Sequence, residues 1–191
     1  MSLETVADVT LLLFYQANKS KFGCFSNFDQ HRFTVEVSKE LPSNVNDAIG
    51  GVEFPSAEHA IMAAKAGMFR DDETLQLIKN APTPMRAKRL GRKVRGFDEE
   101  QWRSVRAAIA RVILTCKFSQ IKRYGDVLRS TLTAGVGGTP ALIAEASPTD
   151  AIWGIGMSKS EAVKAAKRFG KWVIKGENLL GETLMQVARV I

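Results

Sequence analysis

The chain is poor in the residue types on which disulfide frameworks and most metal sites depend. It has two cysteines and two histidines among 191 residues. Cys24 and Cys116 form no spacing motif, so we expect reduced thiols and a cytoplasmic location rather than a disulfide scaffold. His31 and His59 cannot build a usual zinc site without help from other ligands, and we therefore expect no metal and no cofactor.

Long apolar runs and the common catalytic signatures are also missing. No run approaches the roughly 20 apolar residues that cross a bilayer, so we expect no membrane association. The first ten residues include Glu4 and Asp8 and lack a basic start, which argues against a secretory signal. The sequence contains no P-loop, no Gly-x-Ser-x-Gly elbow, no metal-binding histidine pair and no Cys–His protease signature. Few polar groups suited to chemistry are left.

Positive charge, by contrast, is abundant and unevenly placed. The net charge is +7, and the sequence pI is near 9.6. Two clusters carry much of it: Arg86, Lys88, Arg89, Arg92, Lys93 and Arg95, and then Lys159, Lys164, Lys167, Arg168, Lys171 and Lys175. Such clusters suit phosphorylated ligands or nucleic acid, although a solvated helix face explains the second cluster equally well.

Hydrophobic periodicity predicts an α+β fold, a mostly helical domain with a small β-sheet. One domain over residues 1–191 is the expectation for this length. Strands are predicted at residues 11–15, 33–37 and 142–146, with an irregular surface connection at 41–51. Helices are predicted at residues 56–67, 71–80, 84–91, 98–118, 124–133, 158–170 and 182–190.

The first of these helices carries the most informative pair of residues. Glu58 and Lys65 lie seven positions apart, nearly two whole turns, so both project from one helix face. A carboxylate and an amine on one surface can divide acid/base and nucleophilic work. Apolar neighbours lower the pKa of a lysine amine, as a Schiff-base nucleophile requires. Alternatively, Glu58 is only a carboxylate that the helix dipole favours at the start of a helix, and Lys65 is a solvated surface side chain.

A second dense segment runs over residues 145–156. Asp150 could act as an acid/base or orient a sugar hydroxyl, and Trp153 could stack on a base or a sugar. Gly154 and Gly156 would allow close backbone approach to a ligand. The alternative is an Asx turn beside a core tryptophan.

Single residues elsewhere are further candidates for ligand contacts. Arg92 could hold a phosphate through its guanidinium, or it could be an ordinary surface arginine. Asn27, next to Phe28 in an aromatic-rich loop, could bind a ligand or cap a turn. Asn178, before the last helix, could likewise be a cap or a ligand contact.

Taken together, the ordered motifs resemble the NADAR, or YbiA-like, family of N-glycoside hydrolases. The resemblance covers roughly residues 12 to 190. Its motifs are residues 25–28, 54–60 with 64–65, 87–92, 102–106, 117–118, 145–156 and 176–181 with 184–185. It implies a YbiA-like α+β fold and cleavage of a ribose C1–nitrogen bond. By position the family's glutamate falls on Glu58, its helix lysine on Lys65, its aspartate on Asp150, and two tryptophans on Trp102 and Trp153.

The resemblance implies two substrate classes. One is ADP-ribose attached to guanine bases of nucleic acid, which we favour because two basic clusters suit a diphosphate and a strand. The other is the phosphoribosyl, ribosylamino-pyrimidine intermediates of riboflavin biosynthesis. A third hypothesis is that the protein binds ADP-ribose or nucleic acid without catalysing a reaction. The segments 38–51 and 159–168 depart from the family pattern. The choice of DNA or RNA and the oligomeric state are open.

The predicted site therefore has two groups. The catalytic group is Glu58, Lys65 and Asp150. The substrate-binding group is Asn27, Phe28, Arg92, Trp102, Trp153, Gly154, Gly156 and Asn178.

Overall fold

The computed structural model describes residues 2–17 and 20–191. The chain forms two compact units, one from Met1–Ser26 with Lys122–Ile191 and one from Asn27–Ile121. Helices dominate, and the strands form one three-stranded and one two-stranded sheet. The predicted α+β, mostly helical class is confirmed.

The first unit is built on the three-stranded sheet, in the order β1–β2–β5. β1 (Ser2–Val6) and β2 (Val9–Phe14) form a hairpin, and β5 (Leu142–Glu145) pairs parallel to β2 with Leu11 opposite Leu142. Residues 10–14 of β2 are all buried, as expected of a central strand covered on both faces. β2 and β5 confirm two predicted strands, whereas β1 was not predicted.

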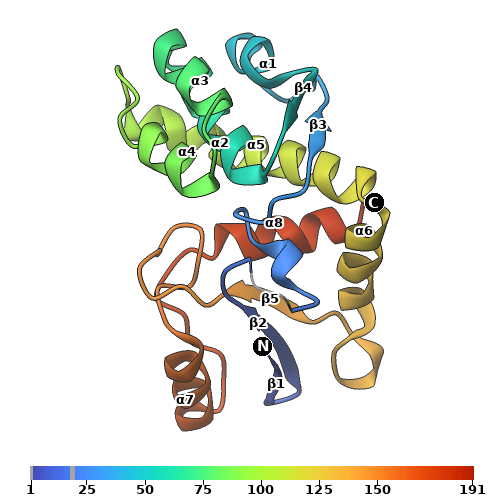
Figure 1. Ribbon diagram of the computed structural model, residues 1–191. Helices are drawn as coiled ribbons and strands as arrows, with labels where there is room; N and C mark the ends of the chain where they lie inside the picture. Colours follow the sequence, from blue (N-terminus) through green and yellow to red (C-terminus); the bar gives the residue numbers. More distant parts are fainter. Residues whose placement is uncertain (1, 18–19) are drawn as a thin grey trace. The chain divides into compact units, whose positions relative to one another are not determined.

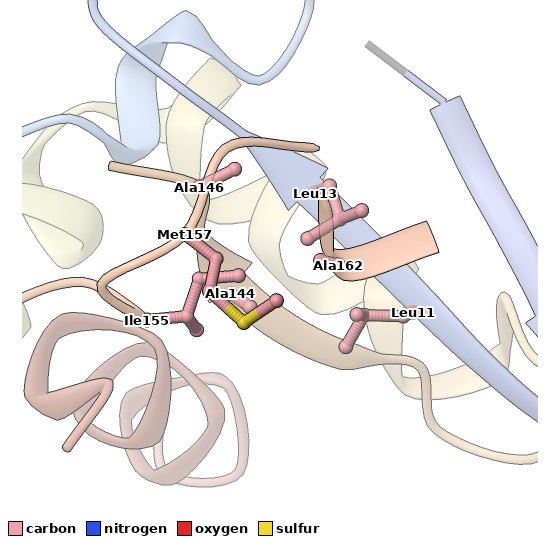
Figure 2. Packing of buried hydrophobic residues seen from close by; sticks show 7 residues of the cluster. All are labelled: Leu11, Leu13, Ala144, Ala146, Ile155, Met157 and Ala162. Carbon is pink, nitrogen blue, oxygen red and sulfur yellow. The ribbon is translucent and has the colours of Figure 1, made fainter. Parts of the chain in front are cut away.

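The hydrophobic core of this unit lies against β2 and β5 (Figure 2). The side chains in the cluster are Leu11, Leu13, Ala144, Ala146, Ile155, Met157 and Ala162. Ala162 comes from α7 (Lys159–Phe169), which begins at a Ser158/Glu161 capping box and ends at the left-handed Gly170. Both ends of α7 confirm the sequence prediction, because the signals are local.

The remaining elements of this unit are helices, labelled in Figure 1, and 3₁₀ turns. α8 (Leu179–Ala188) packs on β5 and on α6 (Lys122–Arg129). The predicted helix at 124–133 is α6 followed by a 3₁₀ turn, η2 (Ser130–Thr133). Two further 3₁₀ turns are η1 (Gly23–Phe25) and η3 (Val136–Gly138). α8 begins three residues before its predicted start, directly after Asn178.

The second unit is organised around α2 (Ala57–Met68), ten of whose twelve residues are buried. A helix that is apolar nearly all round must be covered on every side. The covering elements are α1 (Ser43–Ile49), α3 (Asp72–Lys79), α4 (Pro84–Gly91), α5 (Glu99–Gln120) and β4 (Val52–Phe54), which pairs with β3 (Phe33–Val35). α2 to α5 each begin at a side-chain cap, and all four confirm predicted helices.

The predicted irregular connection at 41–51 is wrong, because its centre is α1. Val45, Ala48 and Ile49 are buried, at the spacing of one helix face. Pro42 and the Gly50–Gly51 pair are turn signals that flank this short helix and do not interrupt it. The inner face of α1 meets α2 where Gly67 opposes Ala48, so closely that a Cβ at 67 would overlap the Ala48 methyl group.

Gly67→Ala is expected to destabilise the protein by about 1–3 kcal/mol, because the added methyl group forces α1 away from α2. In a helix with free space at that position, Gly→Ala stabilises the protein by about 0.5–1 kcal/mol. The sign of the change in the free energy of unfolding therefore shows whether α1 and α2 are in close contact at Gly67. Urea unfolding measures it. In the double variant, Ala48→Gly removes the opposing methyl group. The two substitutions together should therefore destabilise the protein by less than the sum of their separate effects. A single variant as stable as the parent would contradict the close contact.

Candidate active site

The start of α2 is held by a buried serine–histidine pair. The Ser56 hydroxyl accepts from the His59 backbone N–H at 3.3 Å and lies 2.7 Å from His59 Nδ1, while His59 Nε2 lies 3.0 Å from the Ala81 carbonyl. Burial lowers the pKa of His59, and the hydrogen bond to Ala81 opposes this shift only in part. The neutral ring therefore donates from Nε2 and accepts from Ser56 at Nδ1. His59 is a structural residue that fixes where α2 begins.

Glu58 lies in the first turn of α2 and is 5% exposed. The positive end of the helix dipole favours a carboxylate at this position. The Glu58 N–H donates to the Asn27 carbonyl at 2.9 Å, so the structure brings two predicted site residues together. Asn27 is also buried, and its Oδ1 has no hydrogen-bond partner within the described residues. Buried amide oxygens are nearly always bonded in a working protein, which points to a ligand or water at Asn27.

Lys65 lies two turns further along α2, about 10 Å along the helix axis. Its Nζ is 3.6 Å from the centre of the Phe97 ring and 5.9 Å from that of Trp102. The side chain is half-buried. Loss of solvation lowers the pKa of Lys65, the carboxylate of Glu99 partly restores it, and repulsion by Arg92 lowers it again. The sequence-based interpretation of Lys65 as a desolvated amine is thus supported, with two predicted neighbours, Trp102 and Arg92, beside it.

The two rings beside Lys65 come from the start of α5. Asp98 is the N-cap, and its side chain accepts from the Gln101 N–H at 2.8 Å. Phe97 and Trp102 therefore occupy the N′ and N4 positions, which form a hydrophobic staple at many helix starts. Sequence reasoning identified Trp102 but missed Phe97. The staple pattern around Asp98 is the signal that could have found it.

The loop that carries Asn27 and Phe28 is held by cations from α4 and α5. Lys88 lies 5.4 Å from the centre of the half-buried Phe28 ring. Lys117, which is 0% exposed, pairs with Asp29 at 3.4 Å, and Asp29 Oδ2 also lies 3.4 Å from His31 Nδ1. A fully buried lysine is unusual without a partner, so the pair with Asp29 anchors this loop beside the start of α2.

The other predicted residues belong to the first unit, in a pair of loops joined by backbone hydrogen bonds. Asp150 Oδ1 accepts from the N–H groups of Ile152 and Trp153 at 3.1 and 2.9 Å. This is the Asx turn that the sequence left as an alternative, and it does not exclude a chemical role for Asp150. Trp153 is half-buried rather than enclosed in the core.

Gly154 and Asn178 join these loops to each other and to β5. The Asn178 N–H donates to the Gly154 carbonyl at 3.1 Å, and its side-chain Nδ2 donates to the Ile143 carbonyl at 2.9 Å. A Cβ at Gly154 would lie 2.8 Å from the Glu145 carbonyl oxygen, and Gly156 has a φ of 64°. Close backbone packing thus accounts for Gly154, and the left-handed backbone conformation accounts for Gly156. Their contacts with substrate, and that of Asn178, stay predictions.

Residues 2–17 and 20–191 hold no group of three or more His, Cys, Asp or Glu side chains placed to bind a metal ion. No helix in that part is long and apolar enough to cross a bilayer.

Comparison with known proteins gives one consistent result. A family model described as NADAR domain matches residues 13–191. An N-glycosidase of Acanthamoeba polyphaga mimivirus is 34% identical over 92% of this chain and 93% of its own length. N-glycosidase YbiA of Escherichia coli K12 is 27% identical over 97% of this chain and 91% of its own. The NMR structure of E. coli YbiA superposes with a TM-score of 0.66 at 26% identity, covering 96% of this chain and 84% of that one.

Two charge-removing substitutions should shift the pKa of Lys65 in opposite directions. Arg92→Gln removes a repelling cation and raises it, whereas Glu99→Gln removes an attracting carboxylate and lowers it further. NMR titration of ¹³C-dimethylated lysines measures both shifts. Shifts of the same sign, or none, would show that these two charges do not act on Lys65.

The loss of stability on breaking the buried Lys117–Asp29 ion pair should depend on which partner is removed. Asp29→Asn removes the carboxylate charge that the buried Lys117 ammonium faces and is expected to cost about 3 kcal/mol. Lys117→Met leaves a carboxylate that is 15% exposed and still near His31, so it should cost much less. Urea unfolding of both variants and of the double variant gives the comparison. A larger loss for Lys117→Met than for Asp29→Asn would overturn this account.

Proposed function

The chain belongs to the NADAR domain family, and on that premise we propose that it is an N-glycosidase that hydrolyses a ribose C1–nitrogen bond. Its relatives in mimivirus and E. coli carry the name N-glycosidase. The substrate that we propose is ADP-ribose attached to a guanine base of nucleic acid.

The observation that carries this proposal is the environment of Lys65. An amine whose pKa is lowered by burial and by Arg92 has a larger neutral fraction, and only the neutral amine is a nucleophile. The Phe97 and Trp102 rings restrict where the amine can lie. The buried Glu58, on the same face of the same helix, supplies a carboxyl group for proton transfer.

The reaction follows from these two groups. Glu58, in its acid form, gives a proton to the ribose ring oxygen, and the ring opens to an iminium between C1 and the base nitrogen. The neutral Lys65 amine adds to C1. A proton then passes from Lys65 to the base nitrogen, the C1–nitrogen bond to the base breaks, and an imine remains between C1 and Lys65. Water adds to this protonated imine, the sugar leaves as its aldehyde, and the released proton returns to Glu58, so that the neutral lysine and the carboxylic acid are both restored.

Other described residues support binding of the substrate. Arg92 is close enough to influence Lys65 and provides a guanidinium for the diphosphate. Asn27 Oδ1, buried beside Glu58 and without a partner in the described structure, is an acceptor for a ribose hydroxyl or a base N–H. We further propose that Asp150 orients a ribose hydroxyl or activates water and that Trp153 stacks on the ligand.

The competing substrate is a ribosylamino-pyrimidine phosphate. It carries a single phosphate, and Arg92 would be sufficient to bind that phosphate without the other basic residues. We rank it second, because an extended basic surface adjoins Arg92. Turnover of the pyrimidine compound alone would reverse this order.

Replacing Lys65 by Ala should abolish hydrolysis, and Glu58→Gln should slow it by about 10²–10⁴-fold, because proton transfer is lost. Both substrates would be offered to each variant, with the released ribose product measured by mass spectrometry. Borohydride should trap a ribosyl adduct on Lys65 of the unaltered protein. Lys79→Ala is the matched control, because burial also lowers the pKa of Lys79, in α3.

An active Lys65→Ala protein that borohydride does not trap would exclude the imine. It would leave a direct route through an oxocarbenium-like state assisted by carboxylates, in which Asp150→Asn becomes the decisive variant. Release of no ribose product from either substrate, together with unchanged ADP-ribose affinity in Glu58→Ala, would identify the chain as a binding module.

A further inference from the structure

A basic cavity lies along α4 and the turn that follows it. Its volume is about 280 Å³, and it is lined by Arg86, Arg89, Leu90, Arg92 and Lys93. Four of these five side chains are cationic. Only Arg92 among them has a part in the hydrolysis proposed above, so the other cations need an explanation of their own.

The cavity keeps its positive charge because the neighbouring carboxylates are engaged elsewhere. Arg95, at the end of the same basic cluster, pairs with Asp71 at 2.5 Å and with Glu73 at 3.1 Å. This pairing holds the pKa of Asp71 well below its usual range. The four lining cations are exposed, and within the described residues none of them forms an ion pair with a carboxylate.

The spacing of the cations suits a row of phosphates. Arg86 and Arg89 lie one turn apart on α4, and Lys93 lies in the turn that follows the end of this helix at Gly91. Arg92 continues the helical turn as the C-cap of α4. Together with Arg92, these residues provide four cations, more than a single diphosphate needs.

The cavity also adjoins the candidate active site. Arg92 lines it and at the same time repels the Lys65 amine, so the two places are within electrostatic reach of each other. Phe97, whose ring lies against Lys65, is 40% exposed. Sites for single strands combine a row of cations with an aromatic surface on which bases stack, and both components are present here.

We propose that Arg86, Arg89 and Lys93 bind the phosphate backbone of the nucleic-acid strand that carries the modified base. Arg92, which lines the cavity and also acts on the Lys65 amine, serves the diphosphate of the ligand. The inference rests on the proposed function for the identity of the strand. Binding of an unmodified strand, however, requires no turnover and can be measured separately.

The chain supplies a matched control for the test. Lys164, Lys167 and Lys171 have the same i, i+3, i+7 spacing, are exposed, and likewise begin in a helix and end just beyond it. Replacing each set by Gln removes three positive charges. The two triple variants therefore have equal net charge and differ only in where the charge was lost.

The measurement is the affinity for a fluorescent, unmodified single-stranded oligonucleotide, as RNA and as DNA, between about 50 and 200 mM salt. Each phosphate contact on a single strand contributes roughly 0.7 to the slope of log affinity against log salt. The Arg86/Arg89/Lys93 variant should lose about two units of slope and bind more weakly at every salt concentration. The Lys164/Lys167/Lys171 variant should retain the slope of the unaltered protein. Thermal unfolding confirms that both variants are folded.

Three results would overturn the inference. Equal losses in both triple variants would mean that binding follows net charge alone. An unchanged oligonucleotide slope with weakened ADP-ribose binding would assign the cavity to the ligand's own diphosphate. An unchanged slope with weakened binding to phosphatidylserine vesicles would assign it to a membrane surface. A protein that binds strands as expected but releases no ribose product would contradict the hydrolysis alone.

Discussion

The burial of α2 is the constraint on which the rest of the second unit depends. A helix with almost no solvent face needs close neighbours on every side, and the sequence provides them with small residues at the contacts. Gly67 admits α1, and Gly91 of α4 lies directly against Met62. Because packing holds α2 on all sides, a carboxylate at one end and an amine two turns on keep fixed positions. Their desolvation is a cost that the apolar contacts offset.

Sequence reasoning succeeded where the signal was local. Caps at Ser56, Asp71 and Asp98 mark helix starts because a single side chain bonds a backbone N–H three residues on. It failed at α1, where turn-forming residues flank a short helix whose stability comes from packing on α2. β1 was also missed, since an edge strand at a chain start has little pattern of its own.

The candidate site was predictable in its helical part and less so elsewhere. Seven-residue spacing placed Glu58 and Lys65 on one face, and the apolar neighbours of Lys65 correctly indicated a desolvated amine. The ring beneath that amine belongs to Phe97, more than thirty positions away, and spacing alone cannot reveal such a contact. The buried Lys117–Asp29 pair is likewise a product of tertiary folding, because lysine is ordinarily an exposed residue.

The parallel pairing of β2 with β5 has a consequence for biosynthesis. Leu11 lies opposite Leu142, so β2, which pairs with β1 on one side, waits for its second partner until about 130 residues later. The second unit is one uninterrupted segment, Asn27–Ile121, whose contacts can all form while the chain is still being made. Loop closure over so long a distance slows folding. The helices around α2 can therefore assemble while the chain is being made, whereas the edge of β2 that faces away from β1 stays open until β5 emerges.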